Sequence, residues 1–251
     1  MSAPLVCAIG TTDPWNAAGL GLDLRALTEC GARPLMVVTA VSAQDARGLQ
    51  ALHAIPQAMI AAQFAALRAL PVAAYRVGAL PGEAIGAVAA FLAGVAVPVV
   101  IDPVLGATRG GAFVEESGVA AIGRHLIPRA TLLTPNCDEA RRLAGLARCD
   151  DLATMSDAAR RLAERGAAGV LVTGGRRDGV AFDVYFDGEI HVFEHPLVAT
   201  EMRGTGCLLA AALAAALARG IGPHDAIREA RAYVRGKLER SIELGGMRVA
   251  E

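Results

Sequence analysis

Residues 203–207 of this chain read RGTGC, and an almost unbroken run of leucine and alanine follows from 208 to 218. This pattern predicts a tight turn that opens into a buried helix. The first N–H groups of a helix have no partner inside it, and they lie at the positive end of its dipole. We therefore expect an anion site here, most often a site for phosphate. A plain turn into a core helix is the structural alternative.

Cys207 stands at the mouth of this turn. A helix N-terminus lowers the pKa of a cysteine, so we expect a thiol that can accept the proton of an attacking hydroxyl or phosphate. Phosphoryl transfer needs little base catalysis, because positioning and charge neutralisation supply most of its rate. The anion site should therefore matter more than the thiol. The sequence GxxxxGK[ST] is absent, which excludes a P-loop enzyme.

Carboxylate and amide side chains at two later positions could hold a metal ion. Asn136 and Glu139 have the spacing of a helix capping pair, and they could also organise waters around magnesium. Asp102 ends an apolar run, so its charge needs a partner. It could hold a loop, but its place at the end of a predicted strand favours a role near metal and phosphates.

A third group of polar residues lies in the first fifth of the chain. Asp13-Pro14 is an ordinary turn signal, Asp23 could be a solvated helix residue, and Gln44 could be a loop amide. Each of these plain interpretations is about as good as a functional one when the residue is taken singly. Their position after the first two predicted strands is the argument for a site.

The elements that must position these residues alternate regularly. We expect strands at 5–10, 34–41, 73–77, 97–102, 130–133 and 169–172, and an antiparallel hairpin at 180–186 and 189–193. We expect helices at 17–30, 55–70, 82–93, 115–126, 138–146 and 155–165, then the helix after RGTGC and one at 224–243. This order predicts one α/β domain over 1–251, with helices on both faces of a mainly parallel sheet.

Composition narrows the class of protein. The 251 residues are 54% hydrophobic and carry a net charge of −1, so nothing indicates a nucleic-acid partner or a membrane surface. No apolar run predicts a membrane span or a signal peptide, and we expect a cytoplasmic protein. The five cysteines form no CxxC pair, which argues against a disulfide framework or a zinc site. Lys237 is the only lysine, so a phosphate clamp must use arginine, backbone amides or a metal.

Taken in order, these segments resemble the hydroxymethylpyrimidine/phosphomethylpyrimidine kinases of thiamine biosynthesis, which are ribokinase-like proteins. The matching motifs are TDP at 12–14, GxxxD at 19–23, TAxxAQ at 39–44, DPV at 102–104, TPNxxE at 134–139, GG at 174–175 and GTGC at 204–207. Sugar kinases of the same superfamily carry an aspartate where this chain has Cys207. The resemblance extends from about residue 5 to about residue 240.

The resemblance implies a three-layer ribokinase-like sandwich, ATP and Mg²⁺ as cofactors, and 4-amino-5-hydroxymethyl-2-methylpyrimidine or its monophosphate as substrate. It also assigns roles by motif position. Cys207 would be the base, and Gly204, Thr205 and Gly206 the anion hole; Thr11, Asp23, Gln44, Ala79 and Val104 would hold the pyrimidine; Asn136, Thr173, Gly175, Arg176 and Arg203 would hold the nucleotide; Asp102 and Glu139 would lie at the metal.

Several positions depart from the pattern of that family. Thr11 replaces a glycine, Trp15 brings the only indole to the pocket rim, Ala79 replaces a methionine, and Thr173 replaces a lysine near the nucleotide. A kinase for a pyridoxine-like ring or a thiazole alcohol therefore stays open, as does a non-catalytic pyrimidine-binding regulator. One or both phosphorylation steps are compatible with the sequence. The apolar, alanine-rich helices favour a homodimer.

Overall fold

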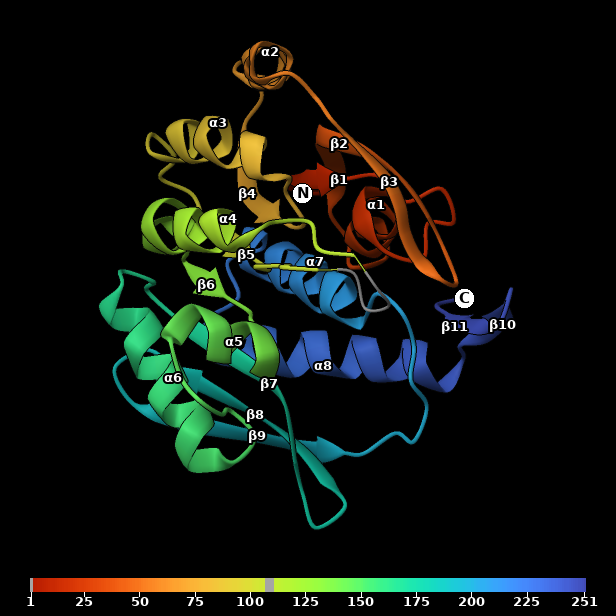
Figure 1. The fold of residues 1–251 in the computed structure, drawn as a ribbon, viewed down its shortest axis with the longest axis vertical. Coiled ribbons are helices and arrows are strands. Elements are labelled where there is room, and N and C mark those ends of the chain that lie inside the picture. The colour runs from red at the N-terminus through yellow and green to blue at the C-terminus, as the bar shows by residue number, and fades with distance from the viewer. Residues whose placement is uncertain (1, 107–110) are drawn as a thin grey trace.

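The computed structural model describes residues 2–106 and 111–251. Within these residues, nine strands form one sheet in the order β3-β2-β1-β4-β5-β6-β7-β8-β9 (Figure 1). The strands are β1 (Leu5–Thr11), β2 (Arg33–Asp45), β3 (Gly48–Ala54), β4 (Val72–Val77), β5 (Val99–Ile101), β6 (Leu132–Leu133), β7 (Val170–Arg177), β8 (Val180–Phe186) and β9 (Ile190–Pro196). The six central strands run parallel to one another, in the order β2-β1-β4-β5-β6-β7. Strand β3 pairs antiparallel with β2 at one edge, and β8 and β9 form an antiparallel extension at the other edge.

Helices cover both faces of the sheet, which confirms the predicted three-layer α/β sandwich. One face packs against α2 (Gln57–Leu67), α3 (Gly82–Leu92), α4 (Glu116–Ala121), α5 (Cys137–Ala144) and α6 (Leu152–Glu164). The other face packs against α1 (Gly19–Glu29), α7 (Thr205–Ala218) and α8 (Pro223–Glu239). Among the described helices, none is long and apolar enough to cross a membrane.

The first strand shows why the central strands have continuously apolar sequences. In β1, Cys7 and Ile9 belong to the core on one face, while Val6 and Ala8 belong to the core on the other. All four side chains are completely buried. A strand that is covered on both faces cannot alternate apolar with polar residues, and this is the usual condition of a central parallel strand.

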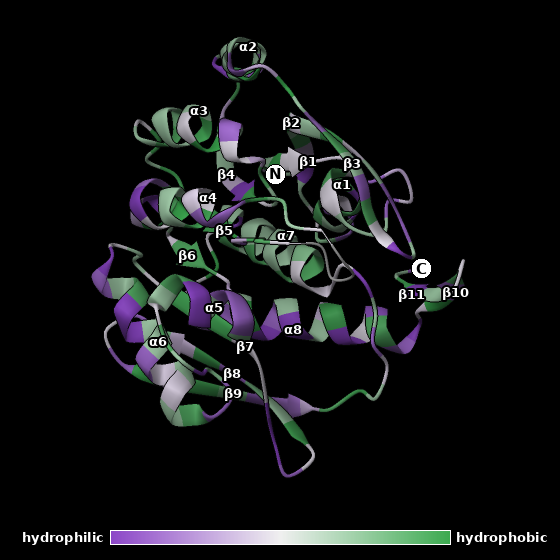
Figure 2. Ribbon diagram, in the orientation of Figure 1, coloured by the Kyte–Doolittle hydropathy of each residue, from purple (hydrophilic) through white to green (hydrophobic). Residues whose placement is uncertain are grey.

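Helix α7 lies in the middle of the molecule and is apolar around its whole circumference (Figures 1 and 2). Every residue from Leu208 to Ala216 is buried. Alanine allows its neighbours α1 and α8 to approach closely, and it loses no side-chain entropy on folding. Helix α8 differs, because purple and green residues alternate along it in Figure 2 and its apolar stripe faces α7.

The structure corrects several expected element boundaries. The second strand continues to Asp45 and turns back through β3, a hairpin that the expected strand at 34–41 misses. Burial alternates along this extension, but the polar side chains of Ser42 and Gln44 are buried and Val41 is exposed, so hydropathy does not indicate a strand there. The helix expected at 115–126 ends at Ala121 and continues as a π-helical and a 3-10 turn. The last helix, expected to reach 243, ends at Glu239. Two short antiparallel strands follow, β10 (Ile242–Leu244) and β11 (Met247–Val249), and two glycines form the turn between them.

Candidate active site

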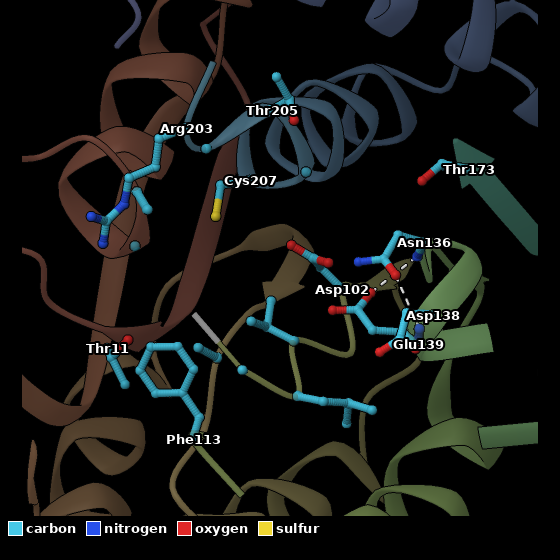
Figure 3. Close-up of a pocket in the computed structure, with 18 of the residues that line it drawn as sticks. Thr11, Asp102, Phe113, Asn136, Asp138, Glu139, Thr173, Arg203, Thr205 and Cys207 are labelled. Atoms are coloured by element: carbon cyan, nitrogen blue, oxygen red, sulfur yellow. Dashed lines mark hydrogen bonds between the residues drawn. The ribbon is translucent and has the colours of Figure 1, made fainter. Parts of the chain in front are cut away.

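A cavity with a volume of about 440 Å³ opens at the carboxyl ends of the parallel strands. Most of the residues expected at the site line it: Thr11, Gln44, Ala79, Asp102, Val104, Asn136, Glu139, Thr173, Arg203, Gly204, Thr205, Gly206 and Cys207. In Figure 3, the Cys207 thiol and the Asp102 carboxylate point into the middle of this space. Thr11 lies on one side of them and Asn136 on the other.

The glycine turn before α7 has the conformation that an anion cradle needs. Gly204 is the N-cap residue and has a left-handed φ of 83°. A Cβ atom there would lie 2.3 Å from the carbonyl oxygen of Ala17, so only glycine fits. The helical ladder begins with Leu208 N–H donating to the Gly204 carbonyl at 2.9 Å. The N–H groups of residues 205–207 precede that ladder and lie at the cavity wall.

Cys207 differs from its expected electrostatic state. Burial raises the pKa of its thiol to about 12, and the nearby Arg76 guanidinium opposes this shift only in part. The expected lowering of this pKa is therefore wrong, because the desolvation of a thiolate outweighs the attraction of the Arg76 guanidinium. Cys207 carries its proton at neutral pH in the ligand-free protein.

A buried ion triad forms the floor of the cavity. Arg76 Nη1 lies 2.9 Å from Asp23 Oδ2, and Arg76 Nη2 lies 2.9 Å from Asp102 Oδ2. Asp23 and Arg76 are almost completely inaccessible, and Asp23 does not line the cavity. The expected contact of Asp23 with a substrate is therefore replaced by an ion pair below the site. Burial raises the pKa of Asp23 to about 7, although Arg76 opposes the shift.

The Asn136–Glu139 pair closes a reciprocal capping box at the start of α5. Glu139 N–H donates to Asn136 Oδ1 at 3.0 Å, and Asn136 N–H donates to Glu139 Oε2 at 3.0 Å (Figure 3). Burial, followed by the charge of Asp102, raises the pKa of Glu139 to about 8. The pKa of Asp102 is also raised by its burial. Two carboxylates thus share a poorly solvated place, which a cation would stabilise.

Arg203 lies on the opposite side of the cavity from the expected nucleotide contacts. Its guanidinium donates to Gln44 Oε1 and, at 3.0 Å, to the Asp45 carbonyl. It also lies 3.6 Å from Asp13 Oδ2. The Asp13 carboxylate in turn accepts the N–H groups of Trp15 and Ala18, each at 3.0 Å. Arg203 therefore organises the wall that Gln44 shares, and its expected contact with a nucleotide stays a prediction.

A second cavity of about 360 Å³ lies on the other side of the glycine turn. It shares Met202 and Thr205 with the first cavity. Gly175 and Arg176, both expected near the nucleotide, line this second cavity and not the first. The two cavities therefore meet at the turn that carries the free N–H groups.

Sequence reasoning missed Arg76, Phe113 and Arg142. Phe113 and Arg142 line the first cavity, and Arg142 donates to Glu116 Oε1 at 2.6 Å. No sequence motif surrounds Phe113 or Arg142 that would have indicated a role at the site. Arg76 did leave a signal, since it interrupts the apolar run from Val72 to Val77. An arginine inside a central strand requires buried acidic partners.

Comparisons with known proteins show the family of the chain. The sequence model described as phosphomethylpyrimidine kinase matches residues 13–250. The chain is 35% identical to a hydroxymethylpyrimidine/phosphomethylpyrimidine kinase from Streptomyces coelicolor, over 98% of this chain and 93% of the relative. The chain belongs to the phosphomethylpyrimidine kinase family. The residues of the ion triad, the capping box and the glycine turn lie within the matched range.

Solved structures confirm the ribokinase-like fold of this phosphomethylpyrimidine kinase family member. An ADP complex of pyridoxal kinase from Bacillus subtilis has a TM-score of 0.92 and 28% identity, and the match covers 100% of this chain and 97% of that one. A phosphomethylpyrimidine kinase from Clostridium difficile 630 has a TM-score of 0.81 and 25% identity, over 94% and 99% of the two chains. The fold is thus similar to kinases of two vitamin precursors.

Proposed function

We propose that the chain transfers the γ-phosphoryl group of ATP to 4-amino-5-hydroxymethyl-2-methylpyrimidine, to its monophosphate, or to both in turn. The observation that carries this proposal is the row of free N–H groups at the start of α7, where two cavities meet. A phosphoryl group bound there has an acceptor cavity on one side and a donor cavity on the other. Membership of the phosphomethylpyrimidine kinase family supports the pyrimidine as acceptor.

Gln44 would recognise the pyrimidine ring. Its side chain is 5% exposed, and its carbonyl oxygen accepts from Arg203. A guanidinium group has donors only, so this contact fixes the amide with its NH₂ group free. A ring nitrogen of the pyrimidine is an acceptor that can receive this N–H. Thr11, Ala79 and Val104 would pack against the rest of the ring.

The donor cavity would hold ATP. Its phosphates would approach the glycine turn, and the adenosine would lie in the second cavity beside Gly175 and Arg176. Arg176 would supply positive charge there, since Thr173 stands where the resemblance predicts a lysine. Because the thiol of Cys207 is protonated, it would act as a weak donor beside the phosphoryl oxygens and not as a base. A loose transition state needs no strong base.

The chemistry of the donor set fits Mg²⁺. Asp102 and Glu139 offer carboxylate oxygens, and burial raises the pKa of both, with the charge of Asp102 adding to the shift at Glu139. Magnesium is commonly held by one or two carboxylates together with substrate phosphates. When bound, the ion would neutralise phosphate charge. The capping bonds of Asn136 would keep the Glu139 carboxylate facing it.

An ADP-release assay tests this function. Purified protein with magnesium and ATP should release ADP when the hydroxymethylpyrimidine or its monophosphate is added. A thiazole alcohol should give no stimulation. If no candidate alcohol stimulates ADP release while calorimetry shows pyrimidine binding, the proposal fails and a regulatory binding protein is the better interpretation.

A pyridoxine-like ring is the second candidate acceptor. Two observations favour it: Ala79 leaves room at the pocket wall, and the fold is similar to a pyridoxal kinase at a TM-score of 0.92. The variant Ala79→Met would fill that space. If pyridoxal is a substrate, this variant should raise its KM more than the KM of the hydroxymethylpyrimidine. Equal effects on both would exclude Ala79 as the cause of a broader specificity.

We also propose a homodimer that acts in the cytoplasm. The support is large apolar side chains that are half-exposed at the sheet edge and on α2, namely Met36, Val41 and Met59. Sedimentation analysis at micromolar concentration should give twice the chain mass of 25.8 kDa. A single species with the mass of one chain would exclude the dimer.

A further inference from the structure

Two histidines and an aspartate gather at the edge of the sheet that lies opposite the cavities. Strand β8 runs antiparallel to β7, so its end at Phe186 lies far from the glycine turn. Asp187 follows that strand, His191 lies on β9, and His224 lies in the first turn of α8. These residues come from three segments of the chain, and nothing in the proposed kinase reaction uses them.

Their donor atoms are close enough to bind one metal ion. His191 Nε2 lies 3.2 Å from Asp187 Oδ1, and His224 Nε2 lies 3.3 Å from Asp187 Oδ2. One ligand atom from each residue lies within 4.8 Å of the other two. Bonds of about 2.0–2.1 Å to a tetrahedral zinc ion place neighbouring ligand atoms about 3.3 Å apart. The separations between aspartate and histidine therefore already match those around a bound ion.

Aromatic packing holds the two imidazole rings in place. The rings of His191 and His224 are nearly perpendicular, at an interplanar angle of 85° with centroids 4.4 Å apart. Tyr185, which is buried, contacts the His224 ring edge-to-face at 5.3 Å and 88°. Metal ligands that are fixed before binding lose little conformational entropy when the ion arrives.

The composition and the exposure of the cluster also suit a cation. The three side chains are each about one third exposed, so an ion can enter from solvent. Two imidazoles and one carboxylate leave positions for water, and imidazole favours zinc, copper and nickel over magnesium.

We propose that Asp187, His191 and His224 form a binding site for a divalent transition metal ion such as Zn²⁺. This site is separate from the magnesium site proposed for catalysis. The ion would join the β8–β9 hairpin to the start of α8. It would stabilise the fold by mass action, because the unfolded chain does not hold the three ligands together. The inference does not depend on the proposed kinase activity.

Calorimetric titration of metal-free full-length protein with Zn²⁺ tests the site. The wild type should bind one ion per chain at micromolar concentration. His191→Ala and His224→Ala should each lower the affinity at least about tenfold, the size of effect known for groups at metal sites. His125→Ala is the matched control, because His125 is an exposed histidine outside the cluster, and it should leave the affinity unchanged.

Cobalt and thermal unfolding give two further readouts. Co²⁺ should produce the visible absorption of a tetrahedral or five-coordinate nitrogen and oxygen site, without the intense charge-transfer band of a thiolate. Zn²⁺ should raise the melting temperature of the wild type and of His125→Ala, but not that of His191→Ala. Binding that survives in both cluster variants, or a thiolate band, would overturn the proposal, since the ion would then bind at cysteines or elsewhere.

Discussion

Arg76 Nη2 lies 2.9 Å from Asp102 Oδ2 under the floor of the cavity, and both side chains are buried. The same guanidinium also holds Asp23. One positive charge is therefore shared by two carboxylates, and the floor of the site keeps a net negative charge. Burial is the main cause that raises the pKa values of both carboxyl groups, and at Asp23 the charge of Asp102 adds to it.

Arg76→Met should destabilise the protein strongly. Removing one partner of a buried ion pair costs about 3–5 kcal/mol, because it leaves an uncompensated charge in the interior. Urea unfolding followed by circular dichroism measures this change. Arg76→Lys keeps the positive charge and should cost less. Equal losses for the two variants would mean that packing, and not charge, is the main contribution of Arg76.

Asp23→Asn should flatten the dependence of stability on pH. The pKa of Asp23 rises from 3.8 to about 7 on folding. A carboxyl group with a raised pKa stabilises the fold at low pH, and this contribution is lost as the pH rises through about 7. Wild-type stability should fall between about pH 4 and pH 7 and level off above that range, and the variant should lose less. Asp157→Asn, at a half-exposed position on α6 where the carboxylate pairs with Arg161, should behave like the wild type.

Gly204→Ala should abolish most of the activity and destabilise the fold. The new Cβ would meet the Ala17 carbonyl at 2.3 Å, so the turn and its N–H groups must move. Gly220→Ala is a matched control, because Gly220 also has a left-handed φ, of 80°, but no atom within 4 Å of the new Cβ. The control should cost about 1 kcal/mol of stability with normal turnover. Turnover and unfolding measurements on both variants decide the point.

Cys207→Ala should cause a moderate loss of kcat, of no more than about 100-fold, and should leave the KM for the pyrimidine nearly unchanged. The reason is that the thiol is protonated and a loose transition state needs little base. Cys30→Ala, which changes a thiol at the far end of α1, is the control. Full activity of Cys207→Ala would remove the thiol from the mechanism. A loss of about 10⁴-fold would contradict the neutral thiol and require a thiolate base.

Glu139→Gln should raise the magnesium concentration needed for half-maximal activity by about tenfold or more. Glutamine can still accept the Asn136 N–H, so the capping box survives and only the charge is lost. Glu164→Gln, at an exposed position near the end of α6, is the control. An unchanged magnesium requirement would show that Glu139 is a capping residue and nothing more.

The main features of the fold could be predicted from the sequence because local signals agreed. The buried runs of β1 and β5 and the RGTGC turn before α7 each have a form that is hard to mistake. The hairpin of β2 and β3 could not be predicted in this way, because hydropathy does not follow burial along the extension of β2. The hairpin of β10 and β11 could not be predicted, because the residues between α8 and this turn continue the helical pattern. Gly245 and Gly246 form the turn between the two strands.

The membership of the site was easier to predict than its electrostatics. Strand ends brought Thr11, Gln44, Asp102 and Asn136 to one cavity, as expected for a parallel sheet. The direction of the pKa shift at Cys207 depends on burial by distant segments, which local sequence does not reveal. The partners of Arg76 and Arg203 lie more than 20 positions away along the chain, so no spacing indicates them.

The burial of α7 has a consequence for how ligands exchange. A helix whose residues 208–216 are enclosed by the sheet and two other helices cannot tilt without disturbing the core of the whole molecule. The amide groups that we propose face the phosphate directly precede this stretch, so we expect most of their ordering entropy to be lost already when the chain folds. Entry and release must depend on the peripheral segments, so mutations there should change rates of exchange while leaving the intrinsic affinity for phosphate largely intact.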